Sequence, residues 1–372
     1  MKSVLATLTA LTILPTVAVT QGAVTVPGSQ RYLMKSTTSG VEYQIDVALP
    51  SGYQSATKRY PVFYILDGNL VFGTLVDAYR TLRIDAAVPE MVLVGVGYPV
   101  DDPAVSTPDY NASRSRDYTP TPVEAIPGSG QGRAFLTFLK DELFPLIDGR
   151  YRTDPTDRGL GGHSFGGLFT NYALLTEPGL FRRYWIGSPS LWWNGQEIFA
   201  TVAPARGRSP HAGGRAFLTV GALEADLMVP PMRRMAALLR QGFPALTVGS
   251  MVYPDETHLS VIGGAISRAL RFLYARPTVP LTVAEAAGYA GRWVSASGET
   301  IVVTAAGTKV SLTMTPFGFP LVAILAAQER DHLFGTNFGM ELMADRDQRG
   351  RVVRLRRQDM GVETVFERAR GR

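Results

Sequence analysis

The segment GGHSFGG at residues 161–167 constrains the fold of this 372-residue chain more than any other segment. Ser164 lies between Gly162 and Gly166, after a short apolar step and before a helix-like run at 168–175. This context is typical of a nucleophile elbow, in which a serine occupies a sharp turn between a strand and a helix. Because the turn strains the backbone and the helix packs closely on the strand, a side chain at Gly162 or Gly166 is expected to block the approach. The alternative is a glycine-rich turn with an incidental serine.

The rest of the first 276 residues alternates between strand-like and helix-like patterns. Continuous apolar runs at 62–66 and 91–96 are typical of strands that are buried on both faces. Strands that alternate with helices predict an α/β fold with a mostly parallel sheet, covered on both faces. Residues 99–130 show no periodicity and are expected to form a long functional loop. Further strands are expected at 41–49, 184–186, 216–220 and 246–252, and helices at 75–82, 134–147, 232–239 and 259–273.

The two ends of the chain differ from this central part. Residues 1–23 begin with one lysine followed by a short apolar run, which predicts a signal peptide and export to the periplasm or medium; an uncleaved anchor is the alternative. Residues 24–276 form the expected α/β-hydrolase domain, which ends at a proline-rich linker. Short β-like runs beyond it predict a small antiparallel β domain over 281–372. This domain could cover the active site, mediate association or bind a surface ligand.

Composition excludes several classes of function. The chain contains no cysteine, so disulfides and cysteine metal sites are excluded. Net charge is +5, but the arginines are scattered without interleaved aromatic residues, so no nucleic-acid partner is expected. No stable membrane insertion is expected either, and the oligomeric state stays open.

A serine nucleophile needs a histidine that takes its proton. Of the four histidines, His163 adjoins Ser164 and is expected to point away from it, His211 lies in a Pro/Gly-rich loop, and His332 lies in the β domain. His258 follows the last expected strand and opens the final helix, where the base of this fold belongs. His258 is therefore the predicted base; the alternative is a helix-capping histidine.

The acid that orients His258 is expected after the strand at 216–220. Glu224 fits a turn at the end of that strand and is favoured over Asp226, two residues further along. The resulting chain order of serine, acid and histidine is that of α/β-hydrolases.

The oxyanion hole needs two backbone N–H donors. Phe165 directly follows the serine and supplies one of them. The second is expected from Gly68 or Asn69, in the loop after the strand at 62–66, because glycine allows close approach of the backbone. The alternative for this loop is a plain turn between strand and helix.

From about residue 30 to residue 276, the chain resembles the putative esterase family of α/β-hydrolases. This family includes ferric-siderophore esterases, S-formylglutathione hydrolase and mycolyltransferases. The matching stretches are residues 65–69 (ILDGN), 116–120 (RDYTP), 151–153 (YRT), 162–167, 188–193 (SPSLWW) and 256–258 (ETH). Together they favour the siderophore-esterase branch. The resemblance implies Ser164 as nucleophile, His258 as base and Glu224 as acid. The C-terminal segment loosely resembles small β-barrel domains appended to secreted serine hydrolases, which esterases of that branch usually lack.

The predicted activity is hydrolysis of a carboxylic ester through an acyl-enzyme, without a metal or organic cofactor. Arg114 and Arg116 either receive an anionic substrate or form local ion pairs. Trp192 and Trp193 either wall an aromatic pocket or pack in the core. A small-molecule ester such as a ferric catecholate trilactone would use both features. A general secreted carboxylesterase, an acyltransferase with the same triad and a non-catalytic binding protein are the alternatives.

Overall fold

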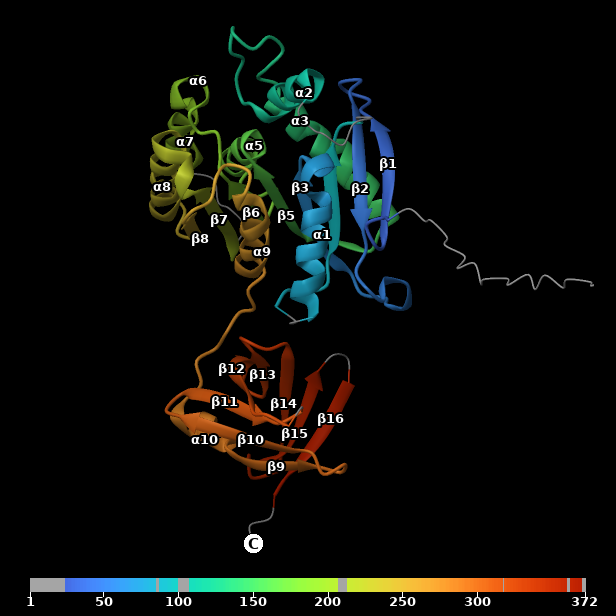
Figure 1. Cartoon of the computed structure of the whole chain (residues 1–372), viewed down its shortest axis with the longest axis vertical. Coiled ribbons are helices and arrows are strands. Elements are labelled where there is room, and N and C mark those ends of the chain that lie inside the picture. Colours follow the sequence, from blue (N-terminus) through green and yellow to red (C-terminus); the bar gives the residue numbers. More distant parts are fainter. Residues whose placement is uncertain are drawn as a thin grey trace, which may run out of the picture.

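The chain forms two units that follow one another in the sequence. The computed structural model describes residues 24–84, 87–99, 107–206, 213–316, 318–359 and 362–369. The expected signal segment at 1–23 and His211 lie outside these residues. An α/β unit comes first, and a β-barrel follows after a linker (Figure 1).

The α/β unit is built on a mixed sheet of order β1-β2-β4-β3-β5-β6-β7-β8. Its described strands are β1 (Ser29–Lys35), β2 (Glu42–Ala48), β3 (Tyr60–Leu66), β4 (Val92–Gly97), β5 (Thr153–His163), β6 (Arg183–Gly187), β7 (Gly214–Gly221) and β8 (Leu246–Tyr253). The pairs β1–β2 and β2–β4 are antiparallel, whereas the other neighbouring pairs are parallel. The apolar strands β3 and β4 lie inside the sheet and are buried, as expected where helices cover both faces. This topology confirms the predicted α/β fold.

Helices and short helical turns cover both faces of this sheet. They are α1 (Gly68–Ile84), α2 (Pro108–Tyr118), α3 (Gly132–Phe138), α4 (Phe144–Arg150), α5 (Phe165–Thr176), α6 (Trp193–Gln196), α7 (Val202–Ala205), α8 (Ala225–Gly242) and α9 (Val261–Leu273), with 3-10 turns η1 (Tyr53–Ser55), η3 (Glu197–Thr201) and η4 (Ala222–Glu224) and a π-helical turn η2 (Leu139–Leu143). Helices α1 and α9 pack with Phe63 and Ile65 on one face. Helices α2–α5 and α8 pack with Tyr64 and Leu66 on the other, because alternate side chains of a strand point to opposite faces.

The predicted loop over residues 99–130 is wrong in part, because Pro108–Tyr118 form helix α2. The helix is polar and shows no apolar stripe, so its sequence lacks the periodicity that predicts a helix. Its beginning is set by Thr107, whose side chain accepts a hydrogen bond from the backbone N–H of Tyr110, and by Pro108 in the first turn. Helix α2 packs on the second face of the sheet, beside the expected active site.

The C-terminal unit is a closed antiparallel barrel of eight strands in the described residues, which confirms the predicted β domain and completes its topology. Helix α10 (Val283–Tyr289) precedes the barrel and begins with a capping box formed by Thr282 and Glu285. The interior is filled by side chains such as Trp293, Leu333 and Phe366, as expected for eight strands. The strands are β9 (Gly291–Ser295), β10 (Thr300–Ala306), β11 (Lys309–Met314), β12 (Leu321–Glu329), β13 (His332–Gly335), β14 (Met340–Arg346), β15 (Val352–Asp359) and β16 (Val362–Arg368).

The barrel lies beyond the end of the sheet that is opposite to α2 and α6 (Figure 1). Arg276, in the linker, donates a hydrogen bond to Glu341 of β14 at 2.7 Å. The end of α1, at Arg83 and Ile84, lines a cavity together with Met340 of the barrel. Among the helices of the described part, none is long and apolar enough to cross a membrane.

Candidate active site

The nucleophile elbow forms where β5 ends at His163 and α5 begins at Phe165. Ser164 between them has φ 61° and ψ −118°, a strained conformation for a residue with a side chain. A Cβ on Gly162 would lie 2.4 Å from the carbonyl oxygen of Gly166, so the expected steric block at Gly162 is confirmed. A Cβ on Gly166 would meet its nearest atoms at an ordinary 3.4 Å, so the expectation there is wrong.

The second close backbone contact of the elbow is made by Gly167 instead of Gly166. A Cβ on Gly167 would lie 2.4 Å from the carbonyl oxygen of Gly187, at the end of β6. Helix α5 therefore packs against the end of β6 through Gly167, and against its own strand through Gly162.

The predicted acid and base meet at the end of the sheet. Nδ1 of His258 lies 2.6 Å from Oε2 of Glu224. The other carboxylate oxygen, Oε1, accepts hydrogen bonds from the Ser188 hydroxyl at 2.6 Å and from the backbone N–H of Gly221 at 2.7 Å. The Glu224 side chain is only 2% exposed, whereas that of His258 is 39% exposed, so the histidine faces the solvent side of the pair.

Glu224 is held as a carboxylate by this environment. Burial raises the pKa of Glu224, but hydrogen bonds from His258, Ser188 and Gly221 outweigh it and bring the pKa below its ordinary value. Asp226 is exposed at the beginning of α8. Of the two acids that the sequence left open, the structure places Glu224 against the histidine. His258 itself lies in the loop before α9, three residues short of the helix it was expected to open.

Two serines after β6 were not singled out by the sequence. Ser188 has a positive φ of 35° and donates to Glu224, as described above. The hydroxyl of Ser190 lies 3.4 Å from that of Ser164. Both belong to the stretch 188–193 that carries the resemblance, which is the signal that could have found them.

The turn between β3 and α1 lies beside the elbow because β3 and β5 are parallel neighbours, with Ile65 opposite Gly161. A Cβ on Gly68 would lie 2.9 Å from the backbone of Gly95, so only glycine fits there without a shift of β4. The Asn69 side chain exchanges two hydrogen bonds with the backbone of Tyr98, at 2.6 and 2.8 Å.

Gly68 and Phe165 are thus the first residues of two helices that begin side by side. Their backbone N–H groups belong to helix N-termini, where amide groups lack intrahelical acceptors. Two such groups directed at one point are what an oxyanion hole requires.

Both candidate substrate-binding arginines form local ion pairs. Arg114 contacts the buried Asp67 at two points, with Nε to Oδ1 at 2.7 Å and Nη2 to Oδ2 at 3.0 Å. Arg116 contacts the buried Asp117 in the same way, at 2.7 and 2.8 Å. Tyr110 donates a further hydrogen bond to Asp67 at 2.9 Å. The charges of both arginines are therefore balanced by neighbouring carboxylates.

The two tryptophans occupy different environments. Trp193 is 1% exposed, and its indole N–H donates to the carbonyl oxygen of Thr121 at 3.1 Å, so it packs in the core. Trp192 is only partly buried, and its ring centroid lies 6.0 Å from that of Phe165. Of the pair, Trp192 is the one placed where a substrate can reach it, next to the residue that follows Ser164.

His163 has an environment that the sequence did not indicate. Its ring is 5% exposed and its centroid lies 4.5 Å from that of His258. Burial, followed by the neighbouring His258, lowers the pKa of His163 to about 3. His163 therefore packs against the candidate base as a neutral ring.

The described residues contain no group of three or more histidine, aspartate or glutamate side chains that could hold a metal ion. The elbow carries the Ser164 hydroxyl, and the paired His258 and Glu224 follow β8 and β7 of the same sheet.

Comparisons with known proteins place this site in context. A family model described as "Putative esterase" matches residues 36–228. The ferri-bacillibactin esterase BesA of Bacillus subtilis is 32% identical over 282 residues, which cover 68% of this chain and 92% of the relative. The siderophore enterobactin esterase of Emericella nidulans is 29% identical over 296 residues, which cover 66% of this chain and 95% of the relative.

Solved structures agree with these sequence matches. The crystal structure of the BES protein from Bacillus cereus has a TM-score of 0.63 at 30% identity and covers 69% of this chain and 99% of that one. The siderophore hydrolase EstB from Aspergillus nidulans has a TM-score of 0.62 at 25% identity, and the match covers 69% of this chain and 98% of that one. The range matched by the family model lies within the α/β unit, and the matches together confirm the resemblance seen in the sequence.

Proposed function

Because this chain belongs to the putative esterase family and is a carboxylic ester hydrolase of the siderophore-esterase branch, we propose that Ser164, His258 and Glu224 form its catalytic triad. The observation that supports this most is the 2.6 Å contact between Nδ1 of His258 and Oε2 of Glu224, at the edge of the sheet where the elbow presents Ser164. The same constellation of serine, histidine and acid catalyses acyl transfer on several folds.

In the proposed reaction, the Ser164 hydroxyl attacks the ester carbonyl carbon while His258 takes its proton. Glu224 fixes the histidine tautomer with Nδ1–H directed at the carboxylate, which leaves Nε2 free to accept the serine proton. The backbone N–H groups of Phe165 and of Gly68 or Asn69 hold the developing oxyanion. His258 then protonates the leaving alcohol, and a water molecule activated by the same histidine releases the acid and regenerates Ser164.

We propose that the substrate is a siderophore ester, a ferric catecholate trilactone. The names of the relatives support this substrate, since they describe esterases of ferri-bacillibactin and of enterobactin. Trp192 supplies an aromatic surface next to Phe165, which suits a catechol ring. Since Arg114 and Arg116 are each paired with a buried aspartate, recognition in this proposal depends on the aromatic surface more than on those two charges.

The test compares p-nitrophenyl acetate, p-nitrophenyl butyrate and a ferric catecholate trilactone as substrates of the full chain and of Ser164→Ala. We expect a higher kcat/KM for the trilactone than for either simple ester, and loss of turnover of all three in the alanine variant. A serine-directed phosphonate should add its mass to the peptide that contains Ser164 and to no peptide of the variant.

Other outcomes would redirect the assignment. Serine-dependent turnover of simple esters alone would indicate a general carboxylesterase. Product that forms only when an acceptor alcohol is present would indicate an acyltransferase. Equal activity of Ser164→Ala and the unmodified chain would refute the triad.

A further inference from the structure

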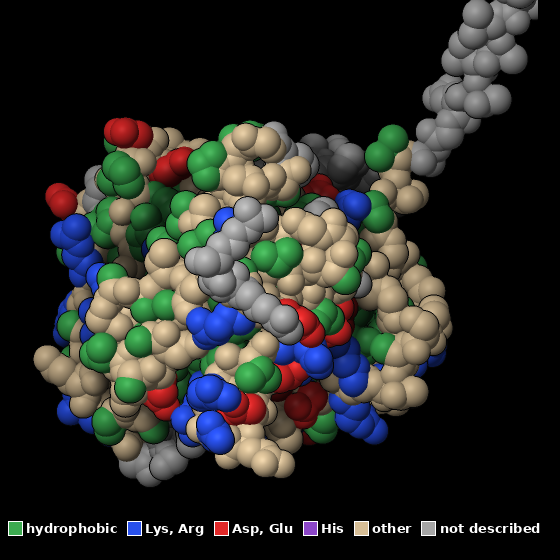
Figure 2. Space-filling view, turned by 90° about the horizontal axis from the view of Figure 1, so that it is seen from below, with side chains coloured by type: hydrophobic (Ala, Val, Ile, Leu, Met, Phe, Trp, Pro, Cys, Tyr) green, Lys and Arg blue, Asp and Glu red, His purple; other side chains and the backbone are tan. Residues whose placement is uncertain are grey.

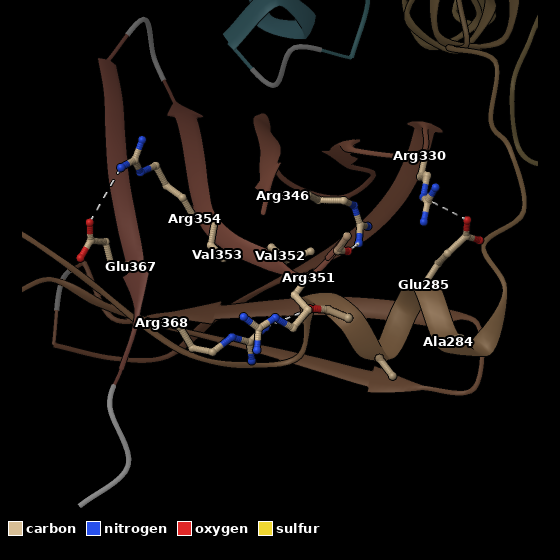
Figure 3. Close-up of a pocket in the computed structure, with 13 residues that line it drawn as sticks. Ala284, Glu285, Arg330, Arg346, Arg351, Val352, Val353, Arg354, Glu367 and Arg368 are labelled. Carbon is tan, nitrogen blue, oxygen red and sulfur yellow. Dashed lines mark hydrogen bonds and ion pairs between the residues drawn. The ribbon is translucent and has the colours of Figure 1, made fainter. Parts of the chain in front are cut away.

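The far end of the barrel carries a cavity of about 870 Å³ that is unrelated to the catalytic residues. Five arginines from separate turns and strands line it: Arg330, Arg346, Arg351, Arg354 and Arg368. Figure 3 shows Arg330 beside Glu285 of α10, and Arg354 on the other side of the view, directed toward Glu367. Two glutamates, Glu285 and Glu367, also line the cavity. The charged groups of the lining are thus mostly cationic.

The cavity belongs to the end of the barrel rather than to its interior. The interior is closed by apolar side chains such as Trp293 and Leu333, both fully buried. The lining comes instead from α10, the turn between β12 and β13, the turn between β14 and β15, the end of β14, the beginning of β15 and the end of β16. These segments meet at the pole that faces away from the α/β unit, where Figure 2 shows lysine and arginine side chains gathered with acidic ones between them.

Several of these arginines have donors that their own partners do not saturate. Arg368 donates hydrogen bonds to the backbone carbonyls of Ala290 (2.7 Å) and Gly288 (2.9 Å), while its guanidinium stacks over Trp293. Arg346 donates from Nε to Asp331 at 2.8 Å and from Nη1 to the Gly350 carbonyl at 2.7 Å, while its Nη2 is buried without a hydrogen-bond partner among the described residues. A guanidinium offers five N–H donors in a planar fork, which suits the oxygens of a phosphate or carboxylate.

The ion pairs at the mouth of the cavity are long and exposed. Arg330 lies 3.5 Å from Glu285, and Arg354 lies 3.9 Å from Glu367. Pairs of this kind contribute little free energy, so a ligand that brings its own negative charges can replace them at small cost. Arg351, paired with Asp347 at 2.8 Å, is 69% exposed and can turn toward such a ligand.

We propose that this cavity binds a small ligand with several closely spaced negative charges, of the polyphosphate or polycarboxylate class. The cavity has the volume that such a ligand needs, and its donors come from five arginines. Four of them are each paired with a carboxylate, which the ligand would have to replace: Arg330 with Glu285, Arg346 with Asp331, Arg351 with Asp347, and Arg354 with Asp345 and Glu367. The proposal is independent of the catalytic assignment, because the site lies at the opposite pole of the molecule.

The experiment titrates the full chain with tripolyphosphate, and separately with citrate, by isothermal calorimetry at physiological ionic strength. The test variant is Arg351→Glu with Arg354→Glu, and the matched control reverses two exposed arginines of the α/β unit, Arg233→Glu with Arg268→Glu. We expect saturable binding by the unmodified chain, at least about tenfold weaker binding by the test variant and a change of less than about twofold in the control. Turnover of p-nitrophenyl butyrate should be unchanged in both variants.

The outcomes are distinguishable. Binding of both anions supports a general multivalent-anion site, and binding of tripolyphosphate alone supports a phosphate site. Absence of saturable binding for both anions, or equal weakening by the test and control variants, would overturn the proposal. If Arg351→Glu with Arg354→Glu does not fold, Arg351→Gln with Arg354→Gln gives the same comparison without charge reversal.

Discussion

Arg114 and Asp67 form a two-point ion pair that joins helix α2 to the turn beneath the expected oxyanion hole. Asp67 itself has a positive φ of 56°, so this turn is strained and is held by its side-chain contacts. We therefore expect the pair to position the backbone of Gly68 and Asn69, although neither of its residues belongs to the proposed triad.

Replacement of Arg114 by alanine should lower both stability and kcat. It leaves the nearly buried Asp67 carboxylate without its cation, which typically costs about 3–5 kcal/mol of unfolding free energy. The relaxed turn should lower kcat for p-nitrophenyl butyrate by about tenfold to hundredfold, with a smaller effect on KM. Arg116→Ala is the matched control, because it breaks the Arg116–Asp117 pair instead. A rise in KM for anionic esters alone, at unchanged stability, would instead indicate direct substrate contact by Arg114.

The proposed role of Glu224 as triad acid can be tested by a pair of neighbouring substitutions. Glu224→Gln should reduce kcat/KM by about 10²–10⁴-fold, because the amide no longer stabilises the protonated His258 or fixes its tautomer. Asp226→Asn, two residues away and exposed, should retain nearly full activity in the same steady-state assay. An equal loss in both variants would contradict the assignment of Glu224.

The two glycines of the elbow should respond differently to one added methyl group. Gly162→Ala places a carbon 2.4 Å from the Gly166 carbonyl oxygen, a distance that no rearrangement of a side chain can relieve. We expect poor folding or a strongly lowered Tm, with loss of activity. Gly166→Ala makes contacts of 3.4 Å and longer, and should fold with a Tm close to that of the unmodified chain. Differential scanning calorimetry of both variants checks this, and similar melting points would refute it.

His163 should make the fold sensitive to mild acid. Its pKa of about 3 in the folded chain lies below the ordinary value of about 6.5, so between these values the unfolded chain binds the proton and the folded chain does not. Stability should therefore fall as pH decreases through this window, with a contribution of about 1.4 kcal/mol per pH unit. His163→Leu should show a shallower decline when urea unfolding is measured from neutral pH down through this window. Parallel declines in the two proteins would exclude this contribution.

The sequence predicted those parts of the site that depend on order along the chain. Ser164, Glu224 and His258 each follow a strand of the parallel part of the sheet, and such strand ends converge at one edge. The contact between His258 and Glu224 could therefore be inferred from chain order alone. Helix α2 could not be inferred, since its stability comes from packing and from its cap at Thr107 rather than from an apolar stripe.

Contacts across the chain were harder to predict than positions along it. The Arg114–Asp67 pair joins residues that are 47 positions apart. From the sequence, an arginine in a polar segment is equally consistent with a residue that binds substrate and with one that forms an ion pair. The packing of His163 on His258 depends on how two rings turn after their strands end, which no spacing in the sequence encodes. The closure of the barrel likewise depends on short strands, such as β13, whose patterns are too brief to recognise.

Helix α1 begins beside the nucleophile and ends at the barrel, and its 17 residues correspond to about 25 Å. The last strand, β16, ends at the side of the barrel that faces away from the α/β unit (Figure 1). A solid support or fluorescent label attached beyond β16 would therefore lie at the end of the molecule opposite to the candidate active site. Immobilised in that way, the protein would keep the end of the sheet that carries Ser164 clear of the support.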